Sequence, residues 1–243
     1  MTKVAVLDDY QEVALEMADW KSLPSGTEVT VFKNHLSDEC DVSKRLAEFE
    51  VVSAMRERTP FPKRLLENLP NLKLLVTTGM RNASIDVPAA SKLGITVCGT
   101  EGLGYPTAEL TWGLIVSLAR KISEENSSSR SGSWQTTLGI GLNGKKLGIL
   151  GLGNLGAQVA RIGNAFGMNV VSWSQNLTKS KAAENEVTLV SFDELMESSD
   201  FLSIHTVLSD RTRNLIGKRE LNLMKPSAFL VNTSRGSIVN EEA

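Results

Sequence analysis

The chain has 243 residues, with 26 Lys and Arg against 28 Asp and Glu, for a formal net charge of -2. A charge this close to neutral excludes a broad electrostatic grip on nucleic acid or on an anionic membrane. Hydrophobic residues make up 41%. At about 150 residues per domain, we expect one large domain or two small ones, with cores that need no disulfide or metal.

The N-terminus and the cysteines predict a cytoplasmic protein. Asp8 and Asp9 stand where a signal peptide would have its apolar stretch. The longest apolar run, Leu110–Ala119, is about half of the roughly 20 residues that a membrane span needs. Cys40 and Cys98 lie far apart and in no metal-binding or redox spacing, so we expect buried, reduced thiols. No metal site is predicted, because the chain has only two histidines and no cluster of metal ligands.

Short apolar runs alternate with helix-like segments along the chain. Several runs are continuously apolar, which is typical of parallel strands buried on both faces. The alternation predicts an α/β fold with doubly wound parallel sheets. The predicted strands are, in chain order, Lys3–Leu7, Glu28–Phe32, Val51–Ala54, Leu72–Thr77, Thr96–Cys98, Leu147–Leu150, Asn169–Ser172, Phe201–Ile204 and Phe229–Asn232. The predicted helices are Glu12–Trp20, Ser43–Glu50, Val87–Leu93, Thr107–Lys121 and Ala157–Phe166.

A break in composition over residues 99–144 predicts two domains, 1–98 and 99–243. It opens with a stretch rich in Gly and Pro, which cannot form a regular element. After the long predicted helix comes a serine-rich tract, which is either a disordered linker or a helical excursion. We favour the helix, because Trp112 and Trp134 flank the tract and need burial.

The strongest local motif is Gly-Leu-Gly-Asn-Leu-Gly over residues 151–156, between a predicted strand and a predicted helix. Gly151 allows the tight turn, Gly153 lets the backbone approach a pyrophosphate, and Gly156 lets the helix pack against the strand. The helix N-terminus, with Asn154 and Leu155, offers free N–H groups to the phosphates. The motif predicts a dinucleotide site; the alternative is a glycine-rich turn in a non-binding α/β protein.

The position that reads the adenosine ribose has no acidic residue. An Asp or Glu is expected there, about 20 residues beyond the glycines. This chain instead has Ser174, Gln175 and Asn176. Neutral side chains can hydrogen-bond a 2′-hydroxyl or a 2′-phosphate, so NAD and NADP both remain open. The alternative is that Gln175 and Asn176 are ordinary polar loop residues.

Two further features lie at expected strand ends. The turn over residues 78–82 follows a buried strand, and its backbone N–H groups would suit a substrate carboxylate. Arg235 follows the last predicted strand, at the same edge of the second sheet. Ligands bind at this edge in open α/β sheets. We therefore expect Arg235 to reach the substrate.

Four blocks resemble the D-isomer-specific 2-hydroxyacid dehydrogenases and run through nearly the whole chain. The blocks are residues 54–59 (AMRERT), residues 78–109 from TGMRNASID to TAE, residues 146–156 (KLGILGLGNLG), and residues 200–236 from DFLSIHT to VNTSRG. The resemblance implies a flavodoxin-like substrate domain followed by a Rossmann domain that binds NAD or NADP.

The resemblance also implies roles for individual residues. Arg235 matches the arginine that forks onto the substrate carboxylate and carbonyl, which a planar, permanently charged guanidinium does well. A structural ion pair is the alternative for Arg235. Substrate contacts are implied for Arg56, Met80, Arg81 and Asn82, although solvated surface arginines remain possible at the arginine positions. Cofactor contacts are implied for Thr107, His205, Thr206, Thr233, Ser234 and Arg235, and we assign no catalysis to His205.

Hydride transfer to a ketone also needs a proton donor. The family uses a His paired with a Glu, both well downstream of the arginine, and this sequence stops at Ala243. We expect these residues to be a fragment of a longer enzyme with little activity alone, with a natural end as the alternative.

The sequence thus predicts an NAD(P)-dependent oxidoreductase that transfers a hydride between nicotinamide and C2 of a small 2-hydroxy or 2-oxo acid. The alternative is a catalytically silent, dinucleotide-binding regulatory or scaffold protein of the same fold. A homodimer through the region from Thr107 to Trp134 is implied by the resemblance.

Overall fold

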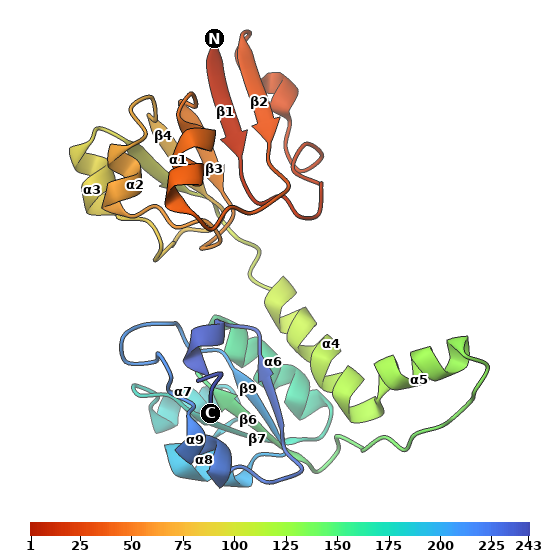
Figure 1. Cartoon of the computed structure of the whole chain (residues 1–243). Coiled ribbons are helices and arrows are strands. Elements are labelled where there is room, and N and C mark those ends of the chain that lie inside the picture. The colour runs from red at the N-terminus through yellow and green to blue at the C-terminus, as the bar shows by residue number, and fades with distance from the viewer. The chain divides into compact units, whose positions relative to one another are not determined.

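A computed structural model describes all residues, 1–243. The chain divides into two compact units, Met1–Gly102 and Leu103–Ala243, and each is built on a five-stranded, all-parallel sheet (Figure 1). These two parallel-sheet α/β units confirm the fold class that the sequence predicts.

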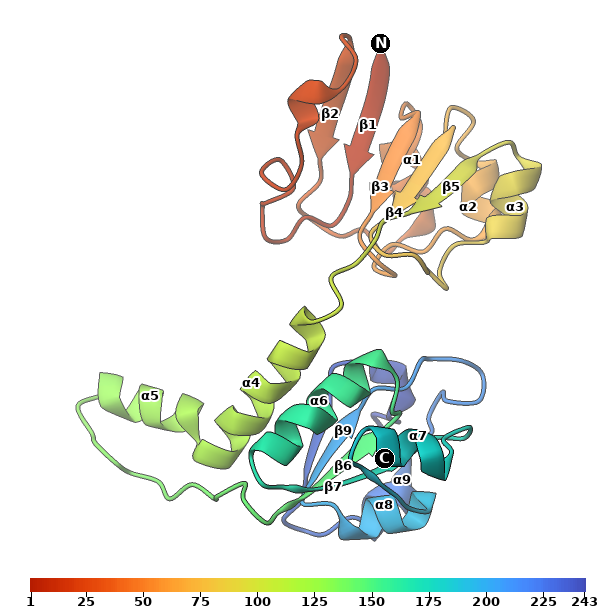
Figure 2. The same ribbon diagram turned by 180° about the vertical axis from the view of Figure 1, so that it is seen from behind.

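The sheet of the first unit has the strand order β2-β1-β3-β4-β5. Its helices α1, α2 and α3 lie together on one face, as Figures 1 and 2 show from opposite sides. Their apolar side chains pack on inward-facing strand residues such as Val52 and Leu75. The elements are β1 Thr2–Val6, a 3-10 turn Trp20–Ser22, β2 Thr27–Val31, α1 Glu39–Leu46, β3 Val51–Ala54, α2 Lys63–Glu67, β4 Leu74–Thr77, α3 Val87–Lys92 and β5 Thr96–Gly99.

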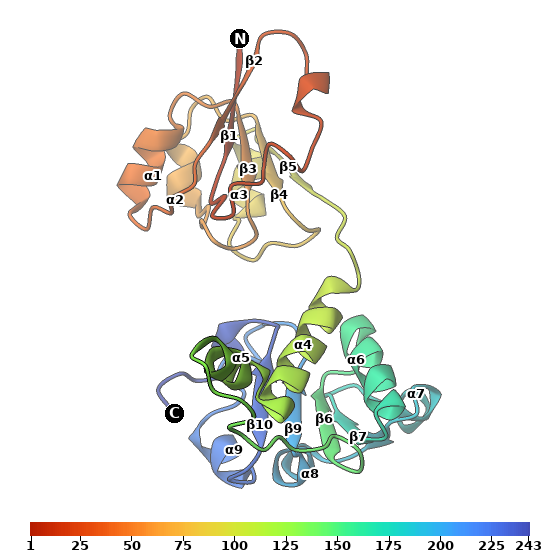
Figure 3. The same ribbon diagram turned by 90° about the vertical axis from the view of Figure 1, so that its right-hand side faces the viewer.

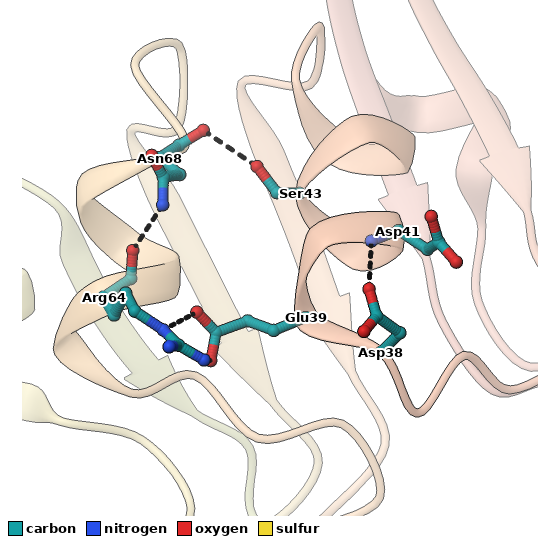
Figure 4. Close-up of polar contacts among 6 residues, drawn as sticks. All are labelled: Asp38, Glu39, Asp41, Ser43, Arg64 and Asn68. Carbon is teal, nitrogen blue, oxygen red and sulfur yellow. Dashed lines mark hydrogen bonds and ion pairs between the residues drawn. The ribbon is translucent and has the colours of Figure 1, made fainter.

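A polar brace joins α1 to α2 on the surface of the first unit (Figure 4). Asp38 caps α1 by accepting a hydrogen bond from the Asp41 N–H. Glu39 then accepts a forked pair from Arg64, at 2.6 and 3.0 Å. Asn68 extends the brace by donating to the Arg64 carbonyl and accepting from Ser43. Because Arg64 is largely exposed, the brace fixes helix orientation more than it stabilises the fold.

The helix predicted over Glu12–Trp20 is wrong. The carboxylate of Asp9 accepts hydrogen bonds from the Val13 and Ala14 N–H groups, which turns the chain. Glu12 also has a φ of 60°, which no α-helix allows. The first N–H groups of a helix have no acceptor within the helix, so these contacts alone do not prevent one; the left-handed Glu12 does. Only the short 3-10 turn over Trp20–Ser22 remains.

The sheet of the second unit has the strand order β10-β9-β6-β7-β8. All nine predicted strands of the chain are present, and the two-residue β8 is the only strand that was missed. The elements are α4 Pro106–Arg120, α5 Ile122–Arg130, β6 Lys146–Leu150, α6 Asn154–Ala165, β7 Asn169–Trp173, α7 Lys179–Glu184, β8 Thr188–Leu189, α8 Phe192–Ser198, β9 Phe201–Ile204, α9 Lys218–Leu223, β10 Phe229–Asn232 and a 3-10 turn Gly236–Ile238.

Each face of the second sheet has its own apolar core. Trp112 and Ile115 of α4 and Val159 of α6 cover one face, and the two helices run side by side (Figure 3). Leu195 and Met196 of α8 belong to the core on the other face. The chain moves outward from β6 to β7 and β8, then crosses back to β9 on the other side of β6. The carboxyl ends of β6 and β9 therefore flank the switch point where open α/β sheets bind ligands.

The serine-rich tract forms helix α5, as favoured, but one reason for that prediction was wrong. Trp112 is buried and donates to the Val159 carbonyl, whereas Trp134 is 78% exposed. The thiols also differ from expectation, because Cys40 and Cys98 are free but exposed rather than buried. None of the helices has the length and apolar character needed to cross a bilayer.

Candidate functional site

The glycine turn after β6 is fixed by close packing of backbone against backbone. Gly151 has a φ of 101°, and a Cβ there would lie 2.9 Å from the backbone of His205 and Thr206. A Cβ on Gly156 would overlap the Gly151 carbonyl oxygen. Both positions therefore require glycine for the fold itself.

Gly153 differs, because a Cβ there would meet no protein atom within 4 Å. Gly153 is the N-cap of the 12-residue helix α6, and no side chain caps that helix. Its first N–H groups, on residues such as Asn154 and Leu155, thus face open space with the positive end of the helix dipole. Free donors at a helix N-terminus suit an anion such as a pyrophosphate, the group that the sequence motif predicts here.

The loop after β7 carries the predicted ribose-reading residues. Ser174 is half-buried and Gln175 is exposed. The Ser174 carbonyl accepts from the Leu177 N–H, which closes the turn. The Ser174 hydroxyl and the Gln175 amide make no hydrogen bond within the protein, so both are available to a ligand.

The loop after β9 packs against the glycine turn and contains His205 and Thr206. The imidazole Nε2 of His205 lies 2.8 Å from the Ser203 hydroxyl. Burial lowers the pKa of His205 to about 4, so this imidazole is neutral at physiological pH. Since a proton donor needs a pKa near the working pH, His205 is a poor candidate for acid–base chemistry.

The loop after β10 is held by hydrogen bonds on both sides of Ser234. The Thr233 hydroxyl lies 2.8 Å from that of Thr111 in α4, whose own hydroxyl also bonds the Thr107 carbonyl. The Ser234 hydroxyl donates to the Thr206 carbonyl at 2.6 Å. These contacts join the ends of β9 and β10 to α4.

Arg235 follows in an exposed position with a fixed backbone. Asn232 donates to the Arg235 carbonyl at 2.9 Å and accepts from the Ser234 N–H. The Arg235 guanidinium donates to the Ser234 carbonyl at 3.1 Å. The fixed backbone limits the directions in which the guanidinium can point. This suits Arg235 to binding an anion.

In the first unit, Arg56 and Asn82 meet at the carboxyl ends of β3 and β4. The Arg56 N–H donates to the Thr78 hydroxyl at 3.1 Å. The Asn82 amide donates to the Arg56 carbonyl and to the Thr77 hydroxyl, at 2.5 and 2.9 Å. Gly79 lies so close that a Cβ on it would overlap the Arg56 guanidinium.

The turn after β4 offers fewer free donors than predicted. The Gly79 N–H is taken by the Thr100 hydroxyl at 2.9 Å. The N–H groups of Met80 and Arg81 have no acceptor within the protein, and both residues are exposed. These two N–H groups, with the Arg81 guanidinium, are the donors left for an anion.

Sequence reasoning missed Thr78 and Thr100, which hold this turn in shape. Each directly follows a parallel strand: Thr78 follows β4, and Thr100 follows β5, the neighbour of β4 in the sheet. Polar residues just after neighbouring parallel strands meet at one edge, so this signal was present in the sequence.

An open parallel sheet whose central strand leads through a glycine turn into an uncapped helix defines a dinucleotide-binding α/β protein. A sequence profile described as "D-isomer specific 2-hydroxyacid dehydrogenase, NAD binding domain" matches residues 112–243. The chain belongs to the D-isomer-specific 2-hydroxyacid dehydrogenase family, whose cofactor is NAD or NADP.

Named relatives agree with this assignment. The chain is 40% identical over 193 residues to a glyoxylate reductase of Thermococcus litoralis, covering 74% of this chain and 58% of the relative. It is 34% identical to a hydroxypyruvate reductase of Thermotoga maritima, covering 89% of this chain and 70% of the relative. A crystal structure of a phosphoglycerate oxidoreductase from Vibrio cholerae superposes with a TM-score of 0.93 at 39% identity, covering 99% of this chain and 78% of that one.

The chain spans about half the length of several curated relatives that it matches, between 46% and 58% for three of them.

Proposed function

We propose that the chain binds NAD or NADP and a small 2-oxo or 2-hydroxy acid, as part of an oxidoreductase that acts at C2 of the acid. The observation that carries this proposal is one sheet edge that holds both the glycine cradle and Arg235. The cradle recognises a pyrophosphate and the guanidinium recognises a carboxylate.

Within this proposal the second unit is the nucleotide domain. The free N–H groups at the start of α6 hold the pyrophosphate, next to Gly153. Ser174 and Gln175 read the adenosine ribose without an acidic side chain, which leaves room for either cofactor. When bound, the nicotinamide accepts or supplies the hydride. Thr107, Thr206 and Thr233 are further proposed cofactor contacts.

Arg235 is the proposed catalytic residue. Its guanidinium would pair with the substrate carboxylate and polarise the adjacent carbonyl. The first unit is the proposed substrate domain, with Arg56, Met80, Arg81 and Asn82 around the acid. The free Met80 and Arg81 N–H groups support this role, because they are unused donors beside guanidinium groups.

Residues 1–243 by themselves are proposed to bind the cofactor and to turn over slowly. The chain has two histidines, and neither is suited to protonate the carbonyl beside Arg235. His205 is half-buried and neutral at physiological pH. His35 is engaged with the buried carboxylate of Asp8, in the other unit.

The decisive experiment measures the oxidation of NADH and NADPH with glyoxylate and with hydroxypyruvate. It is run on residues 1–243 and on the product of the complete open reading frame. We expect turnover by the complete product that falls at least 100-fold in Arg235→Ala, with cofactor binding retained. If the complete product binds cofactor but oxidises none, the activity proposal fails and a regulatory or scaffold role replaces it. Full turnover by residues 1–243 would refute the proposed lack of a proton donor.

We also propose a homodimer, supported by an apolar stripe on α4. Leu110, Leu114 and Leu118 recur every four residues and are 59%, 40% and 40% exposed. Trp134, in the following loop, is 78% exposed. Such a row of exposed large apolar groups marks an interaction surface more often than a free one. A cytoplasmic location is part of the proposal, supported by the two free, exposed thiols.

A further inference from the structure

A buried carboxylate in the first unit has no role in the site described so far. Asp8 lies just after β1, with Leu7 between them, and is only 2% exposed. Its φ of 58° is a conformation that residues other than glycine rarely adopt. Burying a carboxylate and holding it in this conformation both cost free energy, so its surroundings must compensate.

Hydrogen bonds from two other loops satisfy the Asp8 carboxylate. The Thr59 hydroxyl donates to one oxygen at 2.7 Å, and Thr59 is itself buried. The His35 Nδ1 lies 2.9 Å from the other oxygen. Asp8 follows β1, His35 follows β2 and Thr59 follows β3, so the carboxylate joins three neighbouring loops at the carboxyl edge of the sheet.

Asp8 also holds the residue before Thr59. The Arg58 guanidinium donates to the Asp8 backbone carbonyl at 2.7 Å. Its other contact is the ring of Tyr10, with the guanidinium carbon 4.4 Å from the ring centroid. Arg58 is thus fixed between the two sides of the Asp8 loop, although it is exposed.

Arg58 and Thr59 belong to a short segment that begins at Arg56. The Arg56 backbone is hydrogen-bonded to Thr78 and Asn82, in the turn after β4. Arg56 has a φ of 52°, so the segment Arg56–Thr59 contains a second left-handed residue. Asp8 supplies the contacts that hold one end of this segment, and the turn after β4 holds the other.

We propose that Asp8, supported by His35, is a positioning residue for the segment Arg56–Thr59, and that it sets the affinity of the first unit for a 2-oxo acid carboxylate. The effect on affinity rests on the proposed function, whereas the positioning of the segment does not. Asp8 acts through the arginines and does not touch the substrate.

The loop position is tested by NMR on ¹⁵N-labelled protein. Thr59→Val removes one hydrogen bond to Asp8 at nearly constant shape, and Thr59→Ser keeps it. We expect Thr59→Val to shift or broaden the Arg56 N–H and Arg58 guanidinium signals, and Thr59→Ser to restore them. Lys33→Ala is the matched control, because the Lys33–Glu12 ion pair joins the same two loops without touching the arginine segment. Unchanged arginine signals in Thr59→Val would overturn the positioning role.

The effect on affinity is tested with oxalate, a carboxylate that NADH cannot reduce. We expect Asp8→Asn and Tyr10→Ala to weaken oxalate binding at least 10-fold in the presence of NADH, while the NADH dissociation constant changes less than 2-fold. Tyr10→Phe keeps the ring under Arg58 and should bind oxalate like the wild type. If Asp8→Asn does not fold, Thr59→Val takes its place.

The outcomes separate the two proposals. Variants that lower the unfolding temperature but bind oxalate normally would show that Asp8 is only structural. A wild-type protein that binds no oxalate would overturn the proposed substrate role and the affinity half of this inference. The arginine signals would still decide the positioning half.

Discussion

At the residue scale, the three motif glycines have two different roles. Gly151 and Gly156 are required by neighbouring backbone atoms, whereas Gly153 borders open space. The motif itself predicts this division, with Gly153 at the pyrophosphate and Gly151 and Gly156 in the turn and the packing. The close packing of Gly151 against the loop after β9 is the part that no local pattern contains.

Alanine substitutions should separate these roles. Gly151→Ala places a Cβ at a φ of 101° and 2.9 Å from backbone, so we expect a loss of about 2 kcal/mol or more in the free energy of unfolding. Gly153→Ala should stay within about 1 kcal/mol of the wild type but weaken NADH binding at least 10-fold. Urea denaturation and NADH fluorescence titration measure the two effects. Equal loss of stability in both variants would contradict this division.

The neutral His205 predicts a pH dependence of stability. Its pKa is about 4 in the folded protein, below the value of about 6.5 expected in the unfolded chain. The unfolded chain therefore binds the proton more readily, and stability present above pH 6.5 is lost as the pH falls toward 4. The loss amounts to about 3 kcal/mol.

The check is urea denaturation at several pH values between 7.5 and 4. His205→Gln keeps a polar group near Ser203 but cannot titrate, so its stability should fall less over this range. Parallel curves for the wild type and His205→Gln would show that other groups cause the acid sensitivity.

At the element scale, helix α4 has a buried inner face and an exposed apolar outer face. Its inner face, with Trp112 and Ile115, packs in the core of the second unit. Its outer face carries the stripe of Leu110, Leu114 and Leu118. The sequence predicted this helix within one residue at each end, because its length and apolar content are unambiguous.

We expect Leu114→Glu with Leu118→Glu to convert a dimer into a monomer. Both side chains are partly exposed, so the change should alter the free energy of unfolding of the monomer little. Two charges at the centre of an apolar interface would remain unpaired on association. Sedimentation velocity measures the mass. Glu109→Lys on the same helix is a control for charge change alone. A double variant that remains dimeric would exclude this surface.

Other elements show where sequence reasoning stopped. All nine predicted strands exist, because their short length and their alternation with longer helix-like segments distinguish them from buried helices. The segment Glu12–Trp20 has a helical pattern, yet Glu12 adopts a left-handed φ of 60° and the segment forms turns instead. The pairing of Asp8 with His35, across 27 residues of sequence, depends on strand order and was not predictable locally.

At the scale of the whole molecule, the core of the first unit shares no residue with the two cores of the second, which implies two separately stabilised units. A ligand adds stability only to the part that binds it, by about 2.7 kcal/mol at 100 times its dissociation constant. If NADH binds the second unit, hydrogen exchange of amides in β6 and β9 should slow by up to about 100-fold at that concentration. Amides in β1 and β3 should exchange at unchanged rates. Equal slowing in both units would contradict independent stabilisation.

The hydrogen bond between Thr111 and Thr233 links helix α4 to the loop that carries Arg235. The inner side of α4 contacts this loop, while its outer side carries the exposed stripe of the proposed dimer. If the proposed dimer forms through the stripe, the same helix contacts both the second copy and the loop before Arg235. In that case we expect binding at the stripe to alter the position of Arg235, because α4 also packs against β10 in the core of the second unit.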